Sequence, residues 1–145
     1  MRVMVFVPAT PESEAGVMPK TEEFAEMAAF NEQLVKAGIM LAGEGLKPTR
    51  DGVRVEFDAE NTSTVVDGPF SEAKELVAGF WIWQVRSMDE AIEWARRAPF
   101  RATGASDTLA LQIRPIFEAD DFGDALTPEL RELEGRLRAE AASKQ

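Results

Sequence analysis

Three residue types are missing from the 145-residue chain: cysteine, histidine and tyrosine. Without cysteine, the chain has no disulfide, no thiolate nucleophile and no cysteine-ligated metal site. Without histidine, it has no Ser-His-Asp triad, no histidine-ligated zinc and no imidazole that shuttles protons. Any acid–base chemistry must therefore use Asp, Glu or Lys side chains whose pKa values are moved by their surroundings.

Long apolar runs and basic clusters are also scarce. No stretch approaches the roughly 18 consecutive apolar residues of a membrane helix, and residues 1–7 are too short for a secretory signal. The formal net charge is −10, with 16 Lys and Arg against 26 Asp and Glu. This charge repels phosphate backbones and anionic lipids. We therefore expect a cytoplasmic protein that binds neither nucleic acid nor membrane, and the lack of cysteine is compatible with that location.

The residues that are present suit one globular domain, since 45% of them are hydrophobic and they include nine Phe and three Trp. Periodicity predicts strands at residues 2–7, 39–46, 53–57, 62–66, 77–85 and 109–117, and helices at residues 21–37, 87–98 and from Thr127 onward. This order predicts an α+β fold of the ferredoxin-like type with an inserted β-hairpin. We expect a domain over residues 1–120, then an acidic linker and an amphipathic helix over residues 121–145.

Several local signals support these elements. Ser87 and Glu90 are spaced as a capping box at the start of the helix over residues 87–98. Asp51-Gly52 favours a hairpin turn between residues 39–46 and 53–57. The first helix, residues 21–37, is expected to bury a stripe made of Phe24, Met27, Ala28, Leu34 and Val35.

The strands at residues 2–7, 77–85 and 109–117 place apolar side chains on both of their faces. Two helices can cover only one face of such a sheet. A second copy of the chain, packed sheet to sheet by two-fold symmetry, would cover the other face and make a dimeric α+β barrel. The alternative is that the C-terminal helix folds back over the sheet with its leucine stripe, namely Leu126, Leu130, Leu133 and Leu137.

The tetrapeptide Asp67-Gly68-Pro69-Phe70 is the most informative turn. An Asp at a turn commonly accepts a hydrogen bond from the backbone N–H two residues on, and Pro69 has none. The Asp67 carboxylate must therefore bind the Phe70 N–H, Ser71, Lys74 or a ligand. The alternative is that Asp67 caps a short helical turn over residues 71–76.

Two other patterns suggest cofactors only superficially. Gly43-Glu44-Gly45 resembles the start of a dinucleotide loop, but Pro48 takes the third glycine's place and a strand follows. Asp120, Asp121 and Asp124 lack the spacing of a calcium loop and are expected to be a solvated acidic linker. We expect no metal and no cofactor.

One long run carries a family resemblance. Residues 65–81 read VVDGPFSEAKELVAGFW, and they are joined in order by residues 42–46, 89–95 and 113–118. Together these residues resemble the signature of the DGPF branch of the YCII-related proteins, over about residues 1–120. The resemblance implies a ferredoxin-like, dimeric α+β barrel that works as a homodimer.

The resemblance also implies two kinds of function. A related branch includes an enzyme that acts on chlorinated muconolactones, which suggests a small-molecule-binding barrel with lyase or isomerase activity. The YCII branch has been suggested to use a His and Asp pair, but Met27 stands where we would place that His, so this chemistry is not carried over. Members resembling this chain are often encoded beside extracytoplasmic-function sigma factors, which suggests a sigma factor as an alternative, regulatory partner.

Six residues are candidates for lining a ligand pocket because they combine polar groups with aromatic strands: Glu44, Asp67, Lys74, Trp81, Trp83 and Arg114. Each has a plainer alternative. The Trp residues often serve the core, and the charged residues often serve turns, sheet edges or solvation. The sequence leaves open whether the chain is an enzyme, a binding protein or a scaffold.

Overall fold

The computed structural model describes residues 1–72, 75–102 and 108–145 of the chain. Contacts divide it into two units, Met1–Pro115 and Ile116–Gln145, which are described separately below. The domain boundary expected after residue 120 stays a prediction. None of the helices in the described part of the chain combines the length and apolar character that crossing a bilayer requires.

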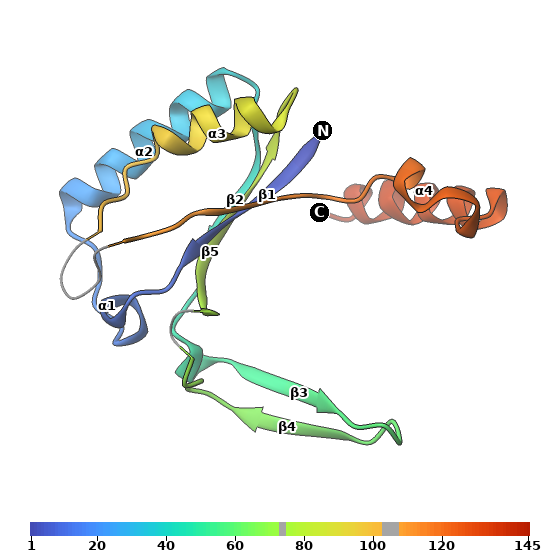
Figure 1. Ribbon diagram of the computed structural model, residues 1–145, viewed down its shortest axis with the longest axis horizontal. Helices are drawn as coiled ribbons and strands as arrows, with labels where there is room; N and C mark the ends of the chain where they lie inside the picture. Colours follow the sequence, from blue (N-terminus) through green and yellow to red (C-terminus); the bar gives the residue numbers. More distant parts are fainter. Residues whose placement is uncertain (73–74, 103–107) are drawn as a thin grey trace. The chain divides into compact units, whose positions relative to one another are not determined.

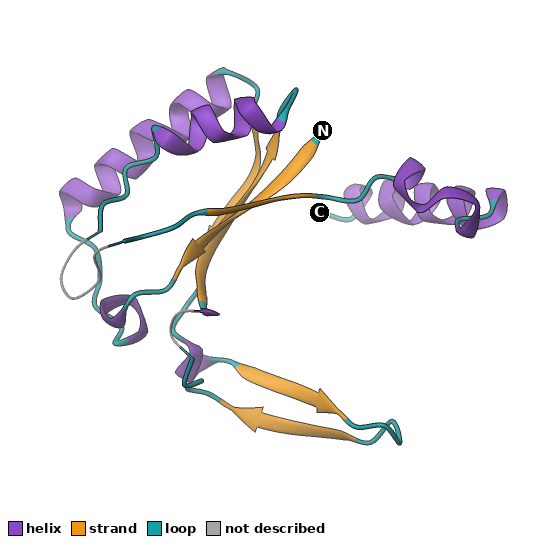
Figure 2. Cartoon of the chain, viewed as in Figure 1, coloured by secondary structure: helices purple, strands orange, loops and turns teal. Residues whose placement is uncertain are grey.

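The first unit is built on a four-stranded antiparallel sheet with the strand order β2-β5-β1-β6. Its strands are β1 (Arg2–Pro8), β2 (Met40–Gly45), β5 (Val77–Gln84) and β6 (Gln112–Pro115), and its two long helices are α2 (Thr21–Lys36) and α3 (Met88–Arg96). Both helices lie on the same side of the sheet (Figures 1 and 2). This arrangement confirms the predicted ferredoxin-like α+β fold.

The core lies between the sheet and these two helices. Val3, Val5, Trp81 and Trp83 point to the helices and are at most 4% exposed. Successive strand residues face opposite sides, so the neighbours of these four residues along β1 and β5 point away from the helices. Four of those residues are apolar, namely Met4, Phe6, Phe80 and Ile82, and they define what we call the open face of the sheet.

Helix α2 forms where the periodicity predicted it, but its buried stripe differs from the expected one. Phe30 and Leu34 are buried, and Met27 packs against them. Phe24 and Val35 are 55% and 61% exposed, because the covered stripe runs through positions 27, 30 and 34 at three- and four-residue spacing. Gly38 then ends the helix region with a φ of 71°, which glycine adopts readily.

The inserted hairpin consists of β3 (Val53–Phe57) and β4 (Ser63–Asp67), and we call it the arm. The sequence predicted the hairpin, but the expected turn at Asp51-Gly52 between residues 39–46 and 53–57 is wrong. β3 pairs with β4, and Asp51 belongs to the short 3₁₀ helix η1 (Thr49–Asp51). The actual turn is held by Asp58, whose carboxylate accepts from two following backbone N–H groups at 2.9 Å.

Two further segments refine the prediction. Residues 8–20, for which periodicity predicts neither a strand nor a helix, contain a short helix, α1 (Pro11–Glu14), whose N-cap is Thr10. The last strand, β6, covers only Gln112–Pro115, because only residues 112–115 pair with β1. The helical turn expected over residues 71–76 lies partly outside the described residues.

The second unit contains the 3₁₀ segment η3 (Ala119–Ala125) and helix α4 (Pro128–Ser143). The Thr127 hydroxyl accepts from Leu130 N–H and so caps α4, which confirms the predicted C-terminal helix. Along its leucine stripe, Leu130, Leu133 and Leu137 are between 37% and 49% exposed. The acidic linker is ordered locally, since Asp120 pairs with Arg131 at 2.7 Å.

Candidate functional site

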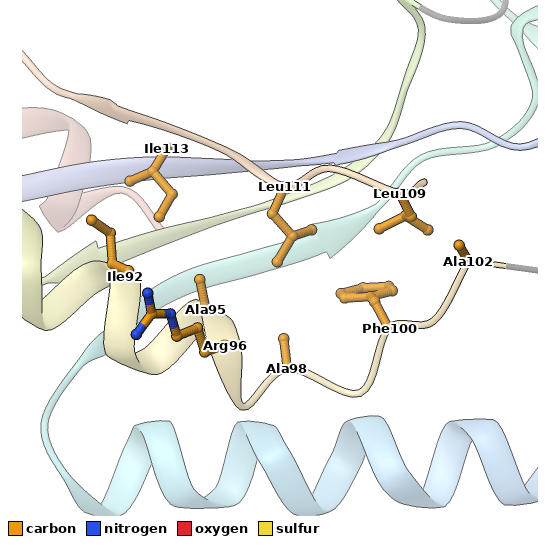
Figure 3. A pocket seen from close by; sticks show the side chains of 9 residues that line it. All are labelled: Ile92, Ala95, Arg96, Ala98, Phe100, Ala102, Leu109, Leu111 and Ile113. Carbon is orange, nitrogen blue, oxygen red and sulfur yellow. The ribbon is translucent and has the colours of Figure 1, made fainter. Parts of the chain in front are cut away.

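A pocket of about 360 Å³ lies between α3, the segment that follows it and the segment leading into β6 (Figure 3). Most of the described side chains that line it are apolar, and one carries a guanidinium. The lining residues are Ile92, Ala95, Arg96, Ala98, Phe100, Ala102, Leu109, Leu111 and Ile113. We call this cavity the α3–β6 pocket.

The local sequence explains why a hollow remains here. On the β6 side, Leu109, Leu111 and Ile113 alternate along the chain, and Ile113 stands beside buried Val5 of β1, so these side chains share the helix-covered face. On the α3 side, Ala95 and Ala98 are too small to fill the space between helix and strand. Large side chains on one wall and alanines on the other leave the pocket open.

An aromatic cluster supports one wall of the pocket. The Phe100 ring meets Trp81 edge to face, with ring centroids 6.0 Å apart, and Trp81 meets Phe30 at 5.7 Å. The Trp81 indole N–H donates to the Asn31 side-chain oxygen at 3.0 Å. Asn31 interrupted the apolar pattern of α2, and this hydrogen bond is its role. The wall is therefore fixed by packing and by a hydrogen bond.

Among the described residues that line the pocket, Arg96 is the one that carries a charge. Its guanidinium pairs with Glu93 at 2.9 Å, and both side chains are largely exposed. An exposed ion pair of this kind contributes little to stability and exchanges partners readily. The arrangement thus offers an open pocket with apolar side chains and a cation at its border, which suits a molecule with an apolar body and an acidic group.

Helix α3 also contains Glu90, a carboxyl group whose hydrogen bonds lower its pKa. The Glu90 carboxylate accepts from the Arg86 backbone N–H at 2.6 Å and from the Arg86 guanidinium at 3.2 Å. These bonds, the backbone one first, lower the pKa of Glu90 below its ordinary value of 4.5. The predicted capping box is therefore half formed: the Ser87 hydroxyl accepts from Glu90 N–H, while the Glu90 carboxylate binds Arg86 instead of Ser87.

The DGPF tetrapeptide forms hydrogen bonds and close contacts at the base of the arm. The Phe70 N–H donates to the Thr49 hydroxyl at 3.0 Å, so Thr49 supplies the acceptor that the sequence had left to Asp67. Thr49 in turn donates through its hydroxyl and backbone N–H to the Glu14 carboxylate, at 2.7 and 3.2 Å. Gly68 packs so closely on the Thr49 carbonyl that a Cβ there would collide with it. The motif therefore has a structural role in joining the arm to α1.

Two of the predicted ligand residues, Glu44 and Arg114, lie on the open face and are exposed. Glu44 on β2 stands beside Phe80 of β5, and Arg114 on β6 stands beside Met4 of β1. β2 and β6 are the two edges of the sheet, and three inter-strand steps of about 4.8 Å separate them by about 14 Å. The two residues share a face without being neighbours.

The remaining predicted ligand residues lie elsewhere. Trp81 and Trp83 are 4% and 0% exposed on the helix-covered face, so they belong to the core rather than to a chamber shared with Glu44 and Arg114. Asp67 is exposed at the end of β4 in the arm. Lys74 lies outside the described residues. Strand alternation turns the Trp side chains away from Glu44 and Arg114, so these candidates do not lie together in one protomer, and their role in ligand binding stays a prediction.

Sequence reasoning missed the pocket residues Arg96 and Phe100. Arg96 stands in the last turn of α3, where a cation also favours the helix dipole, and Phe100 follows Pro99 in a segment with no periodicity. The available signal was the combination of small residues at 95 and 98 with large ones at alternate positions from 109 to 113. Across residues 1–72, 75–102 and 108–145, no cluster of three His, Cys, Asp or Glu is placed to hold a metal ion.

Comparison with known proteins places the chain in a family. The model of the YCII-related domain matches residues 1–118. An uncharacterised protein of Rhizobium meliloti (strain 1021), R00369, is 30% identical over 108 residues, which are 72% of this chain and 84% of that protein. A solved structure, the 5-chloro-2-hydroxyhydroquinone dehydrochlorinase of Burkholderia phenoliruptrix AC1100, in complex with 2,5-dihydroxybenzoquinone, is 19% identical, covering 83% of this chain and 98% of that one with a TM-score of 0.44. By its family model and its relative, the chain belongs to the YCII-related family.

Proposed function

We propose that this protein binds a small molecule with an apolar body and one acidic group in the α3–β6 pocket, and that it does so as a cytoplasmic homodimer. The observation that carries the binding proposal is the pocket itself. Its volume of about 360 Å³ lies within the range of ligand sites, and its described lining side chains are apolar apart from Arg96. The guanidinium at the border would pair with a carboxylate or phenolate of the ligand.

Lyase or isomerase activity is a further part of this proposal and depends on a proton acceptor. Arg96 is the one ionisable side chain among the described lining residues, and Glu93 is the carboxylate bound to it. A ligand that draws Arg96 away would release Glu93 as a base beside the pocket. Binding therefore comes first, and turnover would depend on this exchange of partners.

The homodimer part of the proposal rests on the open face. Met4, Phe6, Phe80 and Ile82 form an apolar surface on the side of the sheet that α2 and α3 leave uncovered (Figure 1). A second copy related by two-fold symmetry would bury this surface against its own equivalent. A sigma-factor partner, the regulatory alternative, is favoured by no observation on the described residues.

The binding proposal is tested by thermal shift with a panel of aromatic and aliphatic acids, each paired with its neutral amide. We expect some acids to raise the melting temperature and the matching amides to do so less. Ala98→Leu should abolish the shift by filling the pocket, whereas Ala110→Leu, next to two lining residues but not itself lining, should keep it. Arg96→Gln should reduce the shift produced by the acids more than the shift produced by the amides. Arg97→Gln, at the neighbouring position, is the control.

Three results would count against binding in this pocket. One is a panel in which no acid shifts the wild type. Another is an equal response to acids and amides, which would remove the role of Arg96. The third is a full response in a folded Ala98→Leu variant, which would place the ligand elsewhere.

A further inference from the structure

The arm has one apolar face, and it is exposed. In the register of the hairpin, Val55 stands opposite Val65, and Val53 and Phe57 flank them on the same side. Their exposed fractions are 58% for Val53, 49% for Val55, 74% for Phe57 and 64% for Val65. We call these four residues the arm face.

The opposite side of the arm is mainly polar. Glu56 stands opposite Thr64 there, and Arg54 stands opposite Val66 with its guanidinium 3.8 Å from the centre of the Phe70 ring. An antiparallel pair that alternates polar with apolar residues is typical of a sheet with one solvated and one covered face. The residue pattern of the arm therefore indicates that its apolar face is covered by another surface.

The arm is also held in place at its base. Thr49 joins Glu14 of α1 to the Phe70 backbone, and Gly68 donates its N–H to the Gly52 carbonyl at 3.0 Å. An element that is already ordered loses less conformational entropy when it binds. This anchoring suits a preformed docking element.

We propose that the arm face packs on the open face of a second copy of this chain, so that two arms are exchanged across the two-fold axis. This inference rests on the homodimer of the proposed function. Stable interfaces bury about 800 Å² per partner, and a large aromatic side chain supplies about 150–250 Å² at most. Phe57 with three valines is too small for such an interface, and the open face adds the apolar side chains of Met4, Phe6, Phe80 and Ile82 to it. In a two-fold symmetric dimer, the contact between an arm face and an open face occurs twice.

Charge also favours this occupant. The arm carries four carboxylates, Glu56, Asp58, Glu60 and Asp67, against the single basic residue Arg54. The open face carries Arg2 and Arg114 against Glu44. In a chain with a net charge of −10, two copies repel unless an acidic surface meets a basic one. Asp67 lies on the arm-face side, where it can meet an arginine of the second copy.

Sedimentation equilibrium on the full chain gives the first test. Phe57→Lys and Val55→Lys should each raise the dissociation constant of the dimer by at least about tenfold, because a charge replaces an apolar contact. The matched control is Thr64→Lys, on the same hairpin but on its polar side beside Glu56. It should leave self-association unchanged. Fluorescence of the buried Trp81 and Trp83 reports whether each variant is folded.

Crosslinking identifies the surface that the arm meets. A photoreactive phenylalanine analogue at position 57 should link two chains, and the linked peptides should include β1 or β5 of the other copy. Mixing light and isotope-heavy protein separates links between copies from links within one. The same analogue at position 64 should give no links between copies.

The outcomes separate this inference from the homodimer itself. A wild-type protein that sediments as a monomer would contradict both the homodimer and the arm exchange. A wild-type dimer that Phe57→Lys leaves intact, or crosslinks confined to one chain or to the other arm, overturns the arm exchange and leaves the homodimer standing.

Discussion

The helix-covered face of the sheet and the arm face use similar residues and have different surroundings. Trp81 and Trp83 lie under α2 and α3 and are at most 4% exposed, whereas Phe57 on the arm is 74% exposed. Aromatic and β-branched residues favour strands in both places. Burial within one protomer is thus a property of topology, since the helices reach the four-stranded sheet and do not pack on the arm.

This difference teaches where the protomer gains its stability and where it has apolar surface left over. Core residues contribute to folding whatever the protein concentration. The arm face contributes to stability only when another surface covers it. If that surface belongs to a second copy of the chain, the contribution depends on the protein concentration. The predictions below separate these two kinds of apolar residue.

The largest effect is expected in the core. Trp83→Ala should lower the free energy of unfolding by about 3–5 kcal/mol, because it leaves a cavity beside Phe30 and Trp81. Phe57→Ala, measured by urea denaturation at a protein concentration low enough for monomers, should cost less than about 1 kcal/mol. Equal losses for the two variants would show that the arm face is buried within the protomer after all.

A smaller and more local effect is expected at the base of the arm. Gly68→Ala should cost about 1–3 kcal/mol, because the new Cβ meets the Thr49 carbonyl. Hydrogen exchange should show faster exchange in β3 and β4 and unchanged exchange in β1 and β5. The control is Gly45→Ala, where a Cβ meets nothing within 4 Å. Loss of protection throughout the sheet would mean that the arm base supports the whole unit.

Most of the fold follows from the sequence for identifiable reasons. The strand at residues 77–85 and the helix beginning after Ser87 are marked by apolar runs and by a cap, and both form where they were predicted. The error at Asp51-Gly52 arose because a turn signal says where the chain bends and not which strands then pair. Pairing depends on contacts distant in the sequence, here between Val53–Phe57 and Ser63–Asp67.

The site was less predictable than the fold. Residue type selected Trp81 and Trp83 as ligand residues, but strand alternation sends them into the core. The pocket depends on Ala95 and Ala98, and small residues carry no chemical signal of their own. Asp67 was singled out for a missing backbone donor, and the structure satisfies the motif through Thr49, 21 residues before Phe70. Such roles need the tertiary structure.

The smallest effect belongs to Glu90 on the covered side of the sheet. Its hydrogen bonds with Arg86 lower its pKa in the folded protein, so the folded state binds the proton less tightly than the unfolded state does. The stabilisation is therefore present above the ordinary value of 4.5 and is lost as the pH falls through the lowered value. We expect Glu90→Gln to be less stable than the wild type at neutral pH, with the difference in the free energy of unfolding shrinking in acid. Urea denaturation of both proteins across that range measures the difference.

A difference that stays constant with pH would mean that the glutamine loses packing or bond geometry rather than charge. Because Glu90 precedes buried Ala91 on α3, the expected change belongs to the protomer and should not vary with protein concentration, unlike any change on the arm face.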